Sequence, residues 1–187
     1  GFVHVRADGY KEESIMYSTI NERSMSIYLT KIYNLSVQLK LDNQNYNKEA
    51  VIYFISEDSS KTVFWPQQKN VQLAEGDYEV QVYIYKNSTL NLGATTQQKC
   101  VTVPRSSIGG ILGFTKRECF DVQVPSQVLS NAISGGGKVN YTFSEGQLRS
   151  SKIINLYAKS LPSPDSLDQL QINNILFESN LLGVEIK

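Results

Sequence analysis

The stretch EGDYEVQVYIYK, residues 75–86, decides the fold class. Its apolar side chains recur at every second position, so Tyr78, Val80, Val82 and Ile84 share one face of an extended chain. The Glu-Gly-Asp triplet in front of them is typical of a turn. The pattern therefore predicts a half-buried β-strand introduced by a tight turn.

The same alternation recurs throughout the first half of the chain, with short polar turns such as Asp42-Asn43 between the runs. Strands at intervals of about ten residues, without amphipathic helices between them, favour a β-sandwich. We expect an Ig-like or transthyretin-like β-sandwich over residues 32–104. Residues 1–31 either add strands to that sheet or form the tail of a truncated module. The strand-like runs lie at residues 2–6, 35–41, 50–56, 61–65 and 70–74.

Residues 105–187 predict a second β-rich domain with one short helix, so the whole chain is expected to be all-β. Ser163-Pro164-Asp165 has the N-cap residue, the proline and the early acid that begin helices, which places a helix near 164–172. The glycine run 135–137 is interpreted as a flexible or positive-φ turn. The strand-like runs of this half lie at 119–125, 138–144, 152–158 and 183–187.

Charge and hydropathy argue against several classes of function. The chain has 18 basic and 18 acidic residues, and its arginines are scattered, so we expect no nucleic-acid partner. No apolar run approaches the roughly 20 residues that cross a bilayer. The first residue is Gly1 rather than methionine, which is compatible with a signal peptide, an anchor or another domain upstream.

The two cysteines indicate an oxidising compartment. Cys100 and Cys119 lie between strand-like runs, and the single histidine supplies too few partners for a metal site. We therefore predict a disulfide, with two buried free thiols as the alternative. In the chain-entropy treatment, closing such a loop contributes roughly 3 kcal/mol to stability.

Three N-x-S/T triplets give a second indication of compartment. They begin at Asn34, Asn87 and Asn140, and all three are candidates for N-glycosylation. Asn87 is favoured because it follows a strand-like run beside an expected turn, whereas Asn34 lies within an alternating strand. Together with the cysteines, these triplets predict an extracellular or cell-surface protein.

The sequence offers little for catalysis. His4 is the only histidine and lies in an alternating strand, where packing or exposure explains it better than a Ser-His-Asp triad. Two carboxylates could hydrolyse a glycosidic bond, but most of the acids lie at turns and solvate the chain. We predict no enzyme, no metal and no cofactor. The acids considered are Glu12, Glu13, Asp58, Glu75, Asp77 and Asp121.

An uncharged glycine–apolar stretch lies between the cysteines and is a candidate interaction loop. Its large apolar residues are Ile108, Ile111, Leu112 and Phe114. If exposed, the loop would be an adhesive tip for a protein groove or a membrane interface. If buried, it would be a connector packed between the two halves, which we favour for a neutral chain. Membrane contact is expected only for the exposed form.

Aromatic residues on the strands allow two interpretations. Tyr83 and Tyr85 lie opposite the core-facing Val82 and Ile84, and Tyr53, Phe64 and Trp65 occur on other strands. Exposed rings could stack on sugars or anchor a protein partner. Burial by the neighbouring domain is the interpretation we favour.

Two segments resemble a known group of modules. Residues 75–86 and VRADGYKEESIMY at 5–17 each carry a glycine turn and a nearby tyrosine. Both resemble the closing hairpins of carboxypeptidase-regulatory-like and PEGA-type modules, which are small transthyretin-like or Ig-like sandwiches. The resemblance covers 32–104 and part of 1–31. It implies a non-catalytic accessory or surface module and assigns no functional residue.

We therefore expect a non-enzymatic, extracellular structural or adhesive module of a cell-surface protein or surface assembly. Its partner would be another protein or a second copy of the chain. The alternative is a secreted carbohydrate-active protein, either a glycan-binding accessory domain or a two-carboxylate hydrolase. Glycan binding together with turnover of a polysaccharide would distinguish the alternative from the first expectation.

Overall fold

The computed structural model describes residues 1–18, 24–86, 90–92, 95–104, 115–124, 127–129, 132–164 and 166–187. Within these residues the chain consists mostly of β-strands, with two helices, α2 (Glu145–Ser150) and α3 (Leu167–Ser179). The all-β class expected from the alternating pattern is confirmed. The Ig-like or transthyretin-like arrangement of strands stays a prediction.

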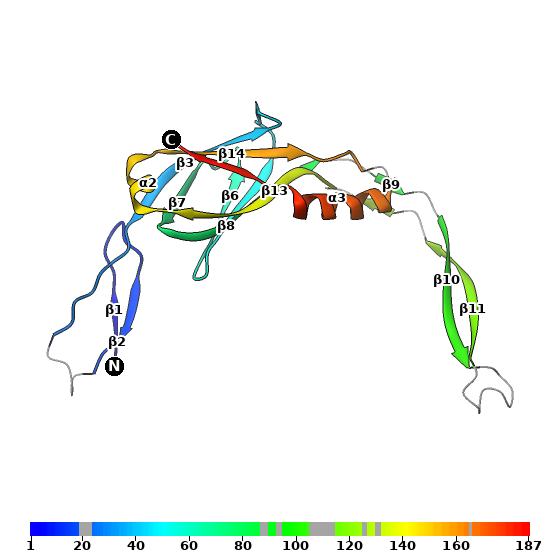
Figure 1. Cartoon of the computed structure of the whole chain (residues 1–187), viewed down its shortest axis with the longest axis horizontal. Helices are drawn as coiled ribbons and strands as arrows, with labels where there is room; N and C mark the ends of the chain where they lie inside the picture. Colours follow the sequence, from blue (N-terminus) through cyan, green and yellow to red (C-terminus); the bar gives the residue numbers. More distant parts are fainter. Residues whose placement is uncertain are drawn as a thin grey trace.

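A large mixed sheet forms the body of the molecule (Figure 1). Its strands follow the order β4-β3-β14-β13-β8-β5-β6, with β15 paired to β14 and β7 paired to β3. The strands are β3 (Ile32–Leu41), β4 (Gln44–Asn45), β5 (Ala50–Ile55), β6 (Ser60–Trp65), β7 (Asn70–Ala74), β8 (Gly76–Lys86), β13 (Ala132–Phe143), β14 (Ile153–Ser160) and β15 (Gly183–Ile186).

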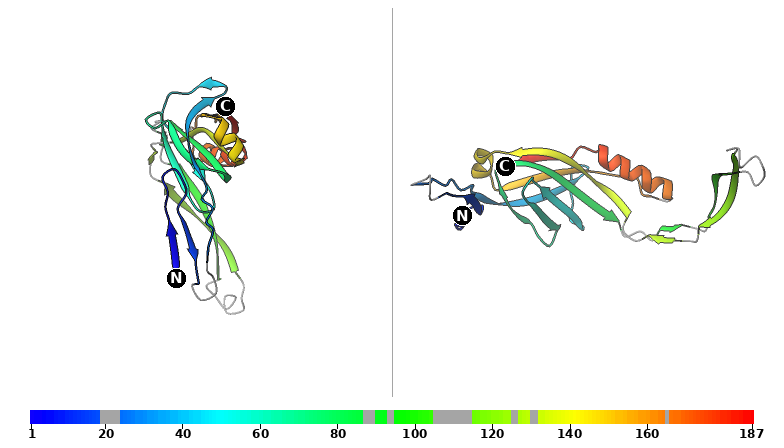
Figure 2. Two further views of the ribbon diagram at one scale, coloured as in Figure 1. Left: turned by 90° about the vertical axis from the view of Figure 1, so that its left-hand side faces the viewer. Right: turned by 90° about the horizontal axis from the view of Figure 1, so that it is seen from below.

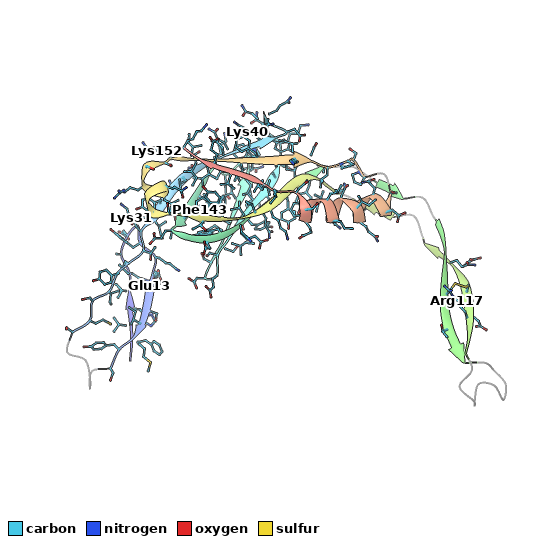
Figure 3. All side chains as sticks on the ribbon, viewed as in Figure 1. Glu13, Lys31, Lys40, Arg117, Phe143 and Lys152 are labelled. Carbon is cyan, nitrogen blue, oxygen red and sulfur yellow. A yellow bond between two sulfur atoms is a disulfide. The ribbon has the colours of Figure 1, made fainter. Side chains whose placement is uncertain are left out.

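The sheet curls so that strands from its two halves share one hydrophobic core. One half contains β3, β7, β14 and β15, and the other contains β5, β6, β8 and β13. Phe143 lies in this core, fully buried, with ring centroids 6.4 Å from Phe54 and 5.4 Å from Tyr78 (Figure 3). The other fully buried side chains come from both halves and include Leu35, Leu39, Ile52, Val63, Leu73, Ile84, Ile154 and Leu156.

Strands from the two expected domains share this sheet, because β14 and β13 lie between β3 and β8. β14 runs parallel to β3, with Ile153 opposite Ser36, and β13 pairs with β8 from Phe143 to Ala132. The boundary expected between residues 104 and 105 therefore does not separate two sheets. The alternation of apolar residues identifies strands, but it does not reveal which distant strands become neighbours.

The expected helix is present as α3, but it begins later and runs further than residues 164–172. Its N-cap is Ser166, whose hydroxyl accepts a hydrogen bond from the Gln169 amide at 3.2 Å. Buried Asn173 fixes the helix to its surroundings, because its amide group donates to the carbonyl oxygens of Ile133 and Pro162 at 3.2 and 2.8 Å. Phe177, one turn further on, stacks on Tyr83 at 4.4 Å.

The glycine run lies inside β13 rather than in a turn, so that interpretation was wrong, although its positive φ angles are present. Gly136 has φ +127° and Gly137 has φ +156°. An added Cβ at Gly136 would lie 1.9 Å from the Val82 carbonyl oxygen and 3.0 Å from the Phe177 ring. The glycines therefore let α3 and β8 approach β13 closely.

Three two-stranded antiparallel sheets lie outside the main sheet in the described part of the chain: β1 (Phe2–Val5) with β2 (Glu13–Met16), β9 (Leu90–Leu92) with β12 (Gln127–Leu129), and β10 (Thr95–Pro104) with β11 (Thr115–Val124). We call β1–β2 the N-terminal ribbon and β10–β11 the long ribbon. Figure 1 and the right-hand view of Figure 2 show the two ribbons at opposite ends of the body.

Candidate functional site

A cleft of about 920 Å³ opens at the end of the main sheet where β5 begins and where β6 and β8 end. The segment between β4 and β5 contributes Tyr46, Lys48 and Glu49 to its wall, and Gln67 follows β6. Because these residues come from separate parts of the chain, the curled sheet is what brings them together. The volume lies in the range of small-molecule sites.

Trp65 also lines this cleft. Its side chain is only 6% exposed, and its indole N–H donates to the Tyr46 carbonyl oxygen at 2.8 Å. The Lys69 ammonium lies 5.7 Å from the centre of the indole ring. The indole thus holds the segment between β4 and β5 in place.

Two aromatic rings in the wall remain accessible. Phe64 is 54% exposed and Tyr85 is 39% exposed. Their neighbour Tyr83 is partly covered, because Phe177 stacks on it. We expected the aromatic residues on these strands to be buried. Tyr83 is partly buried, but Phe64 is exposed.

The polar groups of the cleft are largely neutral. Burial raises the pKa of the Tyr46 and Tyr85 phenols, so both remain protonated hydrogen-bonding groups at neutral pH. Lys48 and Glu49 are adjacent in sequence, and their formal charges cancel. The cleft therefore combines accessible rings with hydrogen-bonding groups and little net charge.

The N-terminal ribbon has a backbone edge that can be assigned residue by residue. The ammonium group of Gly1 donates to the Tyr17 carbonyl oxygen at 2.9 Å, and the Tyr17 amide donates to the Gly1 carbonyl oxygen at 2.8 Å. Hydrogen-bonded pairs alternate with non-hydrogen-bonded pairs along an antiparallel ladder. The pairs Phe2–Met16 and His4–Ser14 are therefore non-hydrogen-bonded, and the backbone N–H groups of Phe2 and His4 point outward from β1.

The cysteine pair lies in the long ribbon. Cys100 and Cys119 are directly opposite in the strand register, at an S–S distance of 2.08 Å. The disulfide expected from the sequence is consistent with this placement. An isolated two-stranded sheet is marginally stable in water, so a covalent link across it holds the strands together.

The three expected glycosylation residues lie in different settings. Asn34 on β3 and Asn140 on β13 are both exposed. Asn87, which the sequence favoured, lies outside the described residues. Modification at any of the three stays a prediction.

The residues considered for catalysis are not gathered into a site. His4 is exposed on β1, Asp58 forms an ion pair with Lys11 at 2.7 Å, and Asp77 accepts a hydrogen bond from the Thr142 hydroxyl. Among the described residues, no group of three His, Cys, Asp or Glu side chains is arranged to hold a metal ion. No helix in the described ranges is long and apolar enough to span a bilayer.

The expected interaction loop, with Ile108, Ile111, Leu112 and Phe114, lies outside the described residues. The strands on either side of it pair with each other, and Pro104 is opposite Thr115. Its assignment as connector or tip stays a prediction.

The cleft itself was not expected from the sequence. The strand residues Phe64, Trp65 and Tyr85 were considered as aromatics, but Tyr46 and Gln67 were not. The only local signal was the polar and aromatic character of the segments that flank the runs 50–56 and 61–65.

The chain matches no protein family model, and comparison with curated proteins and with solved structures found no match. The resemblance to carboxypeptidase-regulatory-like and PEGA-type modules therefore stays a prediction.

Proposed function

We propose that this chain is a non-enzymatic, extracellular structural module that associates with a second copy of itself through strand addition at β1. The observation that carries the proposal is the N-terminal ribbon, a two-stranded sheet whose outward N–H groups belong to Phe2 and His4. An unpaired strand edge readily accepts another strand. Phe2, which is 69% exposed, supplies apolar surface beside this edge.

The extracellular setting is supported by the cysteine pair and by the exposed Asn34 and Asn140. The long ribbon supports an adhesive role, because it projects from the body on the side away from the N-terminal ribbon (Figure 1). Its two strands also pair only with each other among the described strands, so a partner could contact either edge.

Sedimentation velocity over a range of concentrations tests the proposal. Wild-type chain should associate, and His4→Pro should shift it toward monomer, because proline removes an outward N–H without removing a hydrogen bond inside the ribbon. His4→Ala is the matched control, since it removes the imidazole and keeps the N–H. A wild-type chain that stays monomeric, or a His4→Pro chain that associates equally well, would refute strand addition at β1.

A further inference from the structure

We infer that the cleft at the end of the main sheet binds a neutral oligosaccharide. This inference goes beyond the proposed assembly role and does not depend on the ribbons. It rests on the size of the cleft, on its accessible rings and on the charge of its polar groups.

The accessible rings point to a ligand with an apolar face. Phe64 and Tyr85 line the cleft and are 54% and 39% exposed, while Trp65, which also lines it, is nearly covered. The face of an aromatic ring carries a negative quadrupole, which attracts the weakly positive C–H groups of a pyranose ring. Covering these two rings with a sugar would remove apolar surface from water.

The polar groups distinguish a sugar from a fatty chain. The cleft offers the Tyr46 hydroxyl, the Gln67 amide and the Tyr85 hydroxyl, which together can donate and accept hydrogen bonds. The side chain of Gln67 makes no hydrogen bond to another described side chain, so it can bind a ligand hydroxyl without first losing an interaction there. The Tyr46 hydroxyl already donates to the Glu49 carbonyl oxygen at 3.5 Å, but a hydrocarbon would leave the Gln67 amide and the Tyr85 hydroxyl unsatisfied at a cost.

The charges distinguish a neutral sugar from an acidic one. Lys48 and Glu49 both line the cleft, so a phosphate, sulfate or carboxylate would meet a cation and an anion together. Strong anion sites instead concentrate arginine side chains or backbone N–H groups. A neutral polyhydroxylated ring fits both the rings and the polar groups.

The test begins with a glycan array that carries neutral and acidic oligosaccharides. Neutral oligosaccharides should bind, and titration calorimetry with the best of them should show a loss of about tenfold in affinity for both Phe64→Ala and Gln67→Ala. Tyr28→Ala is the matched control, because Tyr28 is an exposed ring in the N-terminal segment outside the cleft, and it should bind as wild type. Urea unfolding of each variant separates lost binding from lost folding.

Three outcomes would overturn the inference: no neutral oligosaccharide bound on the array, a preference for acidic glycans, or binding that neither Phe64→Ala nor Gln67→Ala weakens. His4→Pro should bind the same oligosaccharide with unchanged affinity. A failure of the saccharide site and a failure of strand addition are therefore seen in different variants.

Discussion

Replacing Gly136 with alanine tests whether the glycine run is what lets α3 and β8 approach β13. The new Cβ would lie 1.9 Å from the Val82 carbonyl oxygen, a backbone atom that can move only if the β8–β13 ladder is disturbed. A non-glycine residue at the observed φ of +127° adds about 1–3 kcal/mol of strain. Displacing Phe177 from its buried position would cost about 1.5–3 kcal/mol more.

Together these effects should lower the free energy of unfolding by about 3–5 kcal/mol, or the melting temperature by about 6–20 °C. Urea unfolding followed by fluorescence of Trp65, the only tryptophan, measures the loss. Gly146→Ala in α2 is the control, because nothing lies within 4 Å of its new Cβ. Helix propensity should make that variant up to about 1 kcal/mol more stable. If Gly136→Ala unfolds at the same urea concentration as wild type, the close-approach argument is wrong.

Three other predictions concern separate parts of the chain. Intact-mass analysis should find the non-reduced chain lighter than the reduced chain by two hydrogens. Reduction should speed amide exchange in β10 and β11 more than in β8, because the long ribbon lies outside the main sheet. Equal exchange in the long ribbon before and after reduction would contradict a stabilising role for the disulfide. Phe114→Ala should cost about 3–5 kcal/mol if the loop is a buried connector, as the sequence favours, and should instead weaken liposome or partner binding if it is a tip; a variant unchanged in both measurements refutes both interpretations. Hydrogen bonds from Ser160 lower the pKa of Asp42, so this carboxylate stabilises the fold above about pH 4, and its contribution is lost as the pH falls through the lowered pKa. Asp42→Asn should make acid unfolding less steep, and an unchanged acid transition would contradict a stabilising role for the Asp42 carboxylate.

Local sequence patterns predicted the strands and turns that depend on residues close together in the sequence. The alternation in residues 75–86 identifies β8 because one face of that strand is buried. Asp42 and Asn43 do form the turn between β3 and β4, with φ values of 49° and 66°, as a tight hairpin of these residue types requires. Ser144 and Gln147 form a capping box that begins α2, a readable signal that the sequence analysis did not use.

Strand pairing, close packing and the cleft bring together residues far apart in the sequence, so local patterns could not predict them. The parallel pairing of β3 with β14 joins residues far apart in the sequence. The sequence of neither strand indicates which strand it will pair with. The glycine run was interpreted as a turn because glycine has the same local signature in a turn and in a strand under close packing. The cleft was missed for a related reason, since Tyr46, Phe64 and Tyr85 meet only after the sheet curls.

The pairing of β8 with β13 has a consequence for how this molecule can vary in length. The two strands remain paired up to Lys86 and Ala132, so the chain leaves the body and returns to it at one place. The long ribbon is therefore part of an insertion between the paired strands β8 and β13. Its ten-residue strands make it about 34 Å long. Adding or removing two residues in each strand would lengthen or shorten the long ribbon and keep the same side chains on each of its faces. Every core residue of the body would stay in place.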